Sequence, residues 1–92
     1  MTAAPAGGQL RLRVTVADAW QIVPLSMPPD GTVADLKSRA LAGAGVAAHR
    51  AEEFEVKVGG ARVPDERQRL DAAGVGDGAA LVVLPRRRRA VR

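Results

Sequence analysis

Residues 28–37, with the sequence PPDGTVADLK, lie where the chain changes from strand to helix. The two prolines cannot donate ladder hydrogen bonds, and the Asp-Gly pair after them supports a turn. Thr32 is a natural N-cap residue, and Asp35 follows three positions later as in a shortened capping box. The segment predicts a helix that is stopped by Gly43 or Gly45, because either glycine can adopt the left-handed C-cap conformation. Its apolar stripe recurs at helical spacing: Val33, Leu36 and Ala40.

Two segments of alternating apolar and polar residues precede this helix. In residues 10–16 the apolar side chains fall on every second position, the period of a strand with one buried face. Residues 20–27 continue such an alternation, in which Val23, Leu25 and Met27 share a face. Asp18-Ala19 between them is expected to form a short turn, so the two strands predict an antiparallel hairpin.

The second half of the chain is richer in turns. Gly59-Gly60 suits a two-residue hairpin turn, which needs positive φ angles. The predicted order is a loop at 46–53, a strand at 54–58, a short edge strand at 61–63, one helical turn at 70–73, a turn at 76–78 and a last strand at 79–84.

The complete order is a hairpin, a crossover helix and three further strands, one of them short. Such an order implies an α+β fold in which a mixed four- to five-stranded sheet packs on one helix. This architecture is a β-grasp.

The residues themselves resemble the ubiquitin-like superfamily over about residues 10–86. Residues 29–37 resemble the turn and the capped first turn of the ubiquitin helix. Residues 58–66, followed by 70–75 and 80–84, resemble its C-terminal half in order and spacing. The resemblance implies a ubiquitin-like β-grasp domain.

Within that superfamily, residues 70–84 are also similar to the YukD-like proteins, which are small bacterial ubiquitin-like domains associated with type VII secretion systems. In that group a Gly-hydrophobic-x-x-Gly turn precedes the last strand. The similarity implies an accessory, protein-binding role in secretion.

Charge divides the 92 residues unevenly. Residues 1–85 carry nine positive and ten negative side chains, whereas residues 86–92 add five arginines. We therefore expect a flexible N-terminus at 1–8, one ubiquitin-like domain at 9–85 and a basic tail at 86–92. The tail contains Arg86, Arg87, Arg88, Arg89 and Arg92.

Signatures of catalysis, metal binding and cofactors are missing from the sequence. There is no cysteine, and the single histidine, His49, has only the scattered Ser26 and Ser38 as candidate nucleophiles. The glycines at 74, 76 and 78 precede a strand and do not open a helix, unlike a phosphate-binding loop. No secretory signal or membrane span is evident. These features predict a non-enzymatic cytoplasmic protein without a cofactor or metal.

A role as a conjugated modifier or sulfur carrier is the first alternative. Such proteins end in a flexible Gly-Gly, whereas this sequence ends in Val91-Arg92 and its Gly59-Gly60 pair is placed in a hairpin. This role would require processing of the chain.

Binding of nucleic acid or of an anionic membrane by the arginine tail is the second alternative. The tail has no interleaved aromatic residues on which bases could stack. A solvated tail, or one that contacts a protein partner, is therefore favoured.

The sheet face away from the helix is the predicted partner-binding surface. If Val23, Leu25, Leu81 and Val83 point inward, the alternating residues point outward. The predicted surface comprises Trp20, Ile22, Val82 and Leu84 with the cations Arg11, Arg13 and Lys57. By resemblance, Lys57, Val82 and Leu84 fall where ubiquitin presents its partner-binding patch, with Lys57 in place of an aliphatic residue.

The sequence thus predicts a non-catalytic protein-interaction module whose partner is a protein. The predicted edge strand leaves self-association open. The competing interpretation of the outer face is that Trp20 packs over the hairpin edge and that the exposed valines reflect strand propensity alone.

Overall fold

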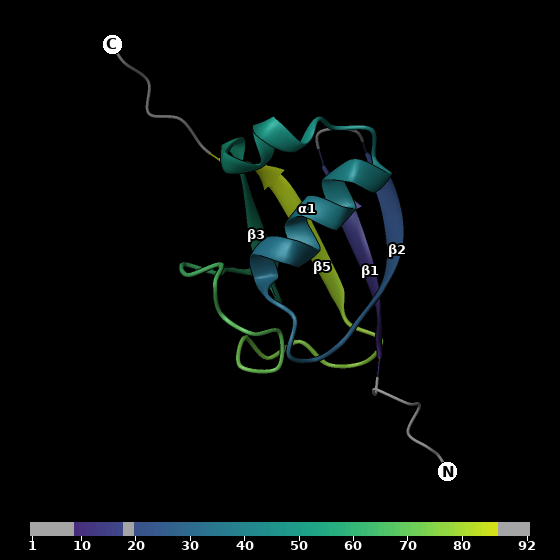
Figure 1. Cartoon of the computed structure of the whole chain (residues 1–92), viewed down its shortest axis with the longest axis vertical. Coiled ribbons are helices and arrows are strands. Elements are labelled where there is room, and N and C mark those ends of the chain that lie inside the picture. The colour runs from purple at the N-terminus through teal and green to yellow at the C-terminus, as the bar shows by residue number, and fades with distance from the viewer. Residues whose placement is uncertain (1–8, 18–19, 87–92) are drawn as a thin grey trace.

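The computed structural model describes residues 9–17 and 20–86, which form one sheet covered on one face by an α-helix (Figure 1). The strands are β1 (Leu10–Val16), β2 (Gln21–Met27), β3 (Phe54–Val58), β4 (Ala61–Arg62) and β5 (Ala80–Pro85). The helices are α1 (Val33–Gly43) and the 3₁₀ helix η1 (Ala48–Glu53). The predicted N-terminal segment 1–8, the turn at 18–19 and the tail after Arg86 lie outside the described residues.

The sheet is mixed, with the order β2-β1-β5-β3-β4. β1 and β5 are parallel at its centre, and all other neighbouring strands are antiparallel. α1 crosses in front of the sheet in Figure 1, with η1 at one end of the sheet and the loop between β4 and β5 at the other. The predicted β-grasp fold is confirmed.

The N-terminus of α1 is fully hydrogen-bonded. The Thr32 side chain accepts from the Asp35 N–H at 3.1 Å, as its capping role predicts. The Val33 and Ala34 N–H groups donate to the carbonyls of Gln68 and Glu66 at 3.0 and 2.7 Å. The loop after β4 therefore supplies partners that a helix cannot provide for its own first turn.

The C-terminus of α1 ends in a Schellman motif, in which Gly45 has the positive φ of 82°. The Val46 N–H donates to Leu41 O at 2.8 Å, and the Gly45 N–H donates to Ala42 O at 3.1 Å. Of the two predicted stop residues, Gly45 takes the left-handed position and Gly43 is the last helical residue.

Three sequence predictions need correction. The predicted loop at 46–53 contains the 3₁₀ helix η1, a local structure that leaves no long apolar periodicity in the sequence. Trp20 lies in the hairpin turn, with its N–H donating to Ala17 O at 3.2 Å, and β2 begins at Gln21. β4 ends at Arg62, although the Val63 N–H still donates to Val56 O at 2.9 Å.

The outer edge of the sheet at β2 is interrupted by a proline. The Arg13 and Ala17 N–H groups donate toward β5, so the alternate residues of β1 pair with β2. The register then directs the backbone groups of Ile22, Pro24 and Ser26 away from β1, toward the free edge. Because Pro24 has no N–H, this edge lacks its central donor for a further strand.

The core fills the space between α1 and the sheet. Its completely buried side chains come from both layers and from the loop before β5: Leu12, Val14, Val16, Met27, Phe54, Val56, Leu81 and Val83 from the sheet, Val33, Leu36, Ala40 and Leu41 from α1, and Leu70. At Gly43 the two layers approach so closely that an added Cβ would lie 2.7 Å from Val23 Cγ1. Glycine therefore sets the distance between α1 and β2.

A buried lysine and its carboxylate partner belong to a network that joins five segments: α1, β3, the loop after β4, the end of β5 and η1. Lys37 on α1 is 4% exposed, and its ammonium donates to Phe54 O at 3.0 Å and pairs with Glu66 Oε1 at 2.6 Å. The other oxygen of Glu66 lies 3.5 Å from the guanidinium of Arg86. Arg86 also donates from Nε to Glu52 O at 2.8 Å. The end of β5 is thereby fixed to η1 and to the loop after β4.

Asp77 completes the sheet where β1 extends beyond β5. Its carboxylate accepts from the Arg11 N–H at 2.8 Å and from the Arg11 guanidinium at 3.4 Å. The Gly78 N–H donates to Arg11 O at 2.7 Å. The hydrogen bonds from Arg11 hold the pKa of Asp77 below its ordinary value, because they favour the charged carboxylate.

The close approach at Gly43 generates the first prediction. Gly43→Ala should lower the free energy of unfolding, because the added methyl group would overpack the stiff side chain of Val23. Overpacking costs about 1–3 kcal/mol. This cost exceeds the gain in helix propensity from glycine to alanine, which is about 0.5–1 kcal/mol. In a Val23→Ala background the same substitution should stabilise the chain. Urea unfolding of the four variants in this cycle measures the coupling, and additive effects would contradict the proposed contact.

Asp77 generates a second prediction, on pH. A carboxylate with a lowered pKa stabilises the fold above its unfolded pKa, and this contribution is lost as the pH falls from about 5 through the folded pKa. Asp77→Asn should therefore flatten the decline of the unfolding free energy on the acid side. Urea unfolding at several pH values tests this. The control is Glu52→Gln, which removes an exposed carboxylate from η1; equal profiles for wild type and Asp77→Asn would contradict the role.

Candidate outer-face binding site

The sheet face opposite α1 presents a continuous row of side chains across all five strands. The registers pair Thr15 of β1 with Ile22 on one side and with Val82 on the other. Val82 pairs in turn with Lys57, and Lys57 pairs with Arg62. The row is uncharged over β2, β1 and β5 and cationic over β3 and β4.

Large apolar side chains are exposed on this face. Trp20 is 83% exposed and Ile22 66%, with Val82 less so at 37%. Leu84, two residues after Val82 on β5, is half-buried and pairs with Glu55. Trp20, Ile22 and Val82 are the only large hydrophobic residues that are exposed in the described part of the chain. We call Trp20, Ile22, Val82 and Leu84 the apolar patch.

Trp20 also has an unfavourable backbone conformation. Its φ is +51°, and among the described residues it is the one non-glycine residue with positive φ. The left-handed region costs a residue with a side chain about 1–2 kcal/mol, and a bulky residue there is an outlier. A glycine would close the same turn without this cost, so the backbone of the turn does not itself favour a tryptophan at this position.

The cations of the outer face differ from those elsewhere. Seven Arg and Lys side chains lie within 4.0 Å of a carboxylate oxygen: Arg11, Lys37, Arg39, Arg50, Arg67, Arg69 and Arg86. Three others have no carboxylate partner among the described residues, namely Arg13, Lys57 and Arg62. All three project from the outer face.

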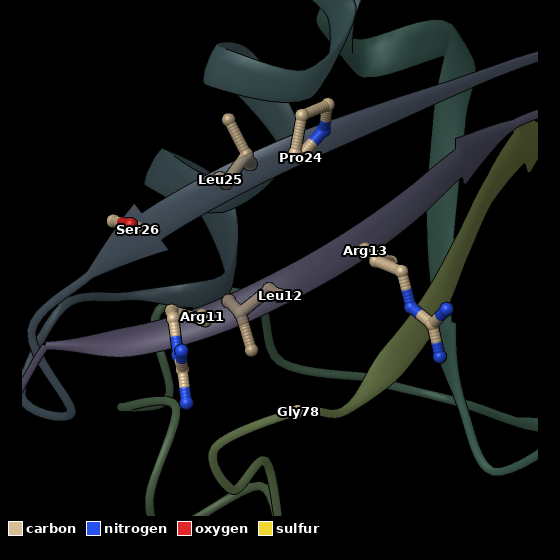
Figure 2. Close-up of a pocket in the computed structure, with 7 residues that line it drawn as sticks. All are labelled: Arg11, Leu12, Arg13, Pro24, Leu25, Ser26 and Gly78. Carbon is tan, nitrogen blue, oxygen red and sulfur yellow. The ribbon is translucent and has the colours of Figure 1, made fainter.

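An open groove of about 480 Å³ adjoins this surface between β1 and β2. The residues that line it are Arg11, Leu12, Arg13, Pro24, Leu25, Ser26 and Gly78. Figure 2 shows the Arg11 and Arg13 side chains extending from β1 in the same direction. Arg11 is engaged by Asp77 at 3.4 Å, whereas Arg13 is available to a ligand.

The structure brings six of the seven predicted surface residues to one side of the sheet. Arg11, Arg13, Ile22, Lys57, Val82 and Leu84 project from their strands on this side. Trp20 lies in the turn two residues before Ile22, outside the strand alternation. Of the predicted basic tail only Arg86 is described, and it is bound to Glu66 and Glu52. Arg87, Arg88, Arg89 and Arg92 lie outside the described residues.

Sequence reasoning missed Arg62. The two-residue turn at Gly59-Gly60, with φ values of 60° and 86°, fixes the hairpin register so that Lys57 opposes Arg62. The length of the turn in the sequence was therefore the signal that places Arg62 opposite Lys57. Sequence reasoning also did not identify the burial of Lys37, which depends on Glu66, 29 positions later in the chain.

Other classes of site find less support in the described part of the chain. No three histidine, aspartate or glutamate side chains gather there in a way that could hold a metal ion. The first N–H groups of α1 are occupied by Thr32, Glu66 and Gln68, so they are not free to bind a phosphate. None of the described helices is long and apolar enough to cross a membrane.

Comparisons with known proteins agree on the fold. No protein-family model matches the chain, and no curated protein has a significantly similar sequence. Among solved structures, the ubiquitin of Caldiarchaeum subterraneum superposes with a TM-score of 0.72 at 18% identity, covering 90% of this chain and 100% of that protein.

Two further structures support the same conclusion. A ubiquitin-like domain from Arabidopsis thaliana has a TM-score of 0.73 at 15% identity and covers 100% of this chain and 94% of its own. A designed protein based on ubiquitin has a TM-score of 0.75 at 19% identity, with coverages of 92% and 98%. At these identities the comparisons establish architecture, and the chain has the ubiquitin-like β-grasp fold.

Proposed function

We propose that this chain is a non-catalytic protein-interaction module that binds its partner through the outer face of the sheet. The observation that carries the proposal is Trp20, which is 83% exposed and has a φ of +51°. A residue that strains a turn while its indole stays exposed gains no burial energy to offset the strain, and such a residue is expected where function requires it. Aromatic side chains are also the anchors that protein interfaces use most.

The position of Trp20 relative to the rest of the patch supports the same conclusion. Ile22 follows it at the start of β2, and Thr15 links Ile22 to Val82 across β1. The apolar patch therefore lies on β2 and β5, with Thr15 of β1 between them, and is not confined to the hairpin. Exposed apolar area rimmed by polar residues is the usual mark of a protein-binding surface.

The free edges of the sheet favour recognition by the face over strand addition. Pro24 removes the central donor from the edge of β2. The opposite edge, β4, is two residues long. A partner that added a strand to either edge would find few backbone groups to pair with.

For the cellular role we propose an accessory component of a bacterial secretion system of the type VII kind, acting in the cytoplasm. The support is the similarity of residues 70–84 to YukD-like proteins. In this segment Gly74, with a φ of 86°, ends a helical turn, and Gly78, with a φ of 83°, precedes β5. The conjugation alternative would need a processed Gly-Gly. Cleavage after Gly60 would remove β5 from the centre of the sheet.

Trp20→Gly tests the proposal because stability and binding should change in opposite directions. Relief of the left-handed strain should raise the unfolding free energy by up to about 1 kcal/mol, and loss of the indole should weaken partner binding. Circular dichroism melts measure the first effect. Affinity capture from the native host, with wild type and variant compared by quantitative mass spectrometry, measures the second.

Trp20→Ala is the matched control, since it removes the indole but leaves a side chain at positive φ. It should lose the same partners without the gain in melting temperature. If Trp20→Gly lowers stability while capture is unchanged, the indole has a packing role and the proposal is wrong. Partners that belong to a membrane secretion machine would support the cellular role, and larger covalent adducts of the chain would support conjugation instead.

A further inference from the structure

The cations on the outer face have a cost that the fold itself does not explain. Lys57 and Arg62 are direct cross-strand partners, and both project from the outer face. Like charges at opposed positions of neighbouring strands destabilise a sheet. No carboxylate of the described residues lies within 4.0 Å of either one, although Glu55 lies only two residues before Lys57 on the same face.

This arrangement contrasts with the other charged surfaces of the domain. Arg39 pairs with Asp35 one helical turn away, Arg50 with Glu53, and Arg69 with Asp71 at 2.7 Å. Local carboxylates thus neutralise the cations on the helices and loops. Among the described residues, the cations without a carboxylate partner are confined to the face that carries the apolar patch.

The free cations flank the central strand of that face. Arg13 on β1 pairs with Ala80 of β5, and Lys57 on β3 pairs with Val82 of β5. A partner side chain seated on Val82 would therefore have a cation within reach on each side of β5, because neighbouring strands are about 4.8 Å apart. Arg62 adds a second cation beyond Lys57.

We propose that the partner segment is an acidic peptide with apolar anchor residues, whose carboxylates bind Lys57, Arg62 and Arg13 while its apolar side chains cover Val82 and Ile22. This inference rests on the proposed function and specifies the chemistry of the partner. Carboxylates supply the charge that the face lacks, and they relieve the repulsion between Lys57 and Arg62.

A single-stranded nucleic acid fits the same face less well. Its recognition relies on several aromatic platforms beside the cations, and Trp20 is the single tryptophan of the chain. Trp20 precedes β2, at the opposite edge of the sheet from Arg62 on β4.

The test begins with selection of peptides from a random 12-residue display library on the immobilised full chain. Selected peptides are synthesised, and their affinities are measured by fluorescence anisotropy. Their sites are mapped by NMR chemical shifts of the ¹⁵N-labelled chain, and dT12 serves as a nucleic-acid probe. We expect enrichment of Asp and Glu beside Leu, Ile or Phe. Replacement of the acids by Gln or Asn should weaken binding at least about tenfold.

Charge reversal on the protein then separates this face from other cations. Lys57→Glu and Arg62→Glu should each weaken binding at least about fivefold. Arg67→Glu, the same charge change in the loop after β4, should leave the affinity within twofold. Arg62→Glu should also raise the melting temperature by about 2–5 °C, because it converts the like-charge pair with Lys57 into an opposite-charge pair.

A full-length variant with serine at the four arginine positions after Arg86 excludes attraction by the tail. Peptides that bind wild type but not this variant, or tighter binding of dT12 that depends on Lys57 and Arg62, would overturn the inference. Neutral apolar peptides that shift Trp20, Ile22 and Val82 would overturn the acidic chemistry but leave the proposed function standing. The absence of any peptide on the outer face would overturn both.

Discussion

The buried ion pair between Lys37 and Glu66 is the interaction on which the arrangement of the domain depends. An ammonium that is 4% exposed is tolerated only with a close anion and further acceptors, because its desolvation costs several kcal/mol. Glu66 must therefore lie against α1, and the loop that carries it then caps the first turn of that helix. Arg86 uses the second oxygen of Glu66, so the last strand is fixed by the same carboxylate. With the inner face of the sheet and the helix N-terminus both occupied, the outer face is the broad surface of the sheet left for contact.

The parts of the fold that sequence reasoning predicts are those with a local physical cause. Alternation defines β1, β2 and β3, the Thr32 cap defines the start of α1, and paired glycines define the β3–β4 turn. Elements that arise from tertiary constraints are missed. The 3₁₀ helix η1 connects α1 to β3 without an apolar period of its own, and the burial of Lys37 depends on a residue far along the chain.

The candidate surface, like the fold, was predictable from the sequence only where a local pattern determines which way a side chain points. Strand alternation identified Ile22 and Val82 as outward residues, and the structure agrees. Alternation also extended β2 to Trp20, although that residue belongs to the turn and has a left-handed backbone. Its conformation depends on the geometry of the turn, which periodicity does not encode.

Pro24 affects which parts of the sheet a partner can use, because it disfavours backbone pairing at the edge of β2. A partner held by backbone pairing would be constrained by strand geometry, whereas a partner held by the face depends on a few side chains that contribute little to the core. Specificity can then change through substitutions at Trp20, Lys57 or Arg62 while the hydrogen-bonded ladder stays intact. The missing donor at Pro24 also disfavours edge-to-edge pairing of β2 with the same strand of another copy.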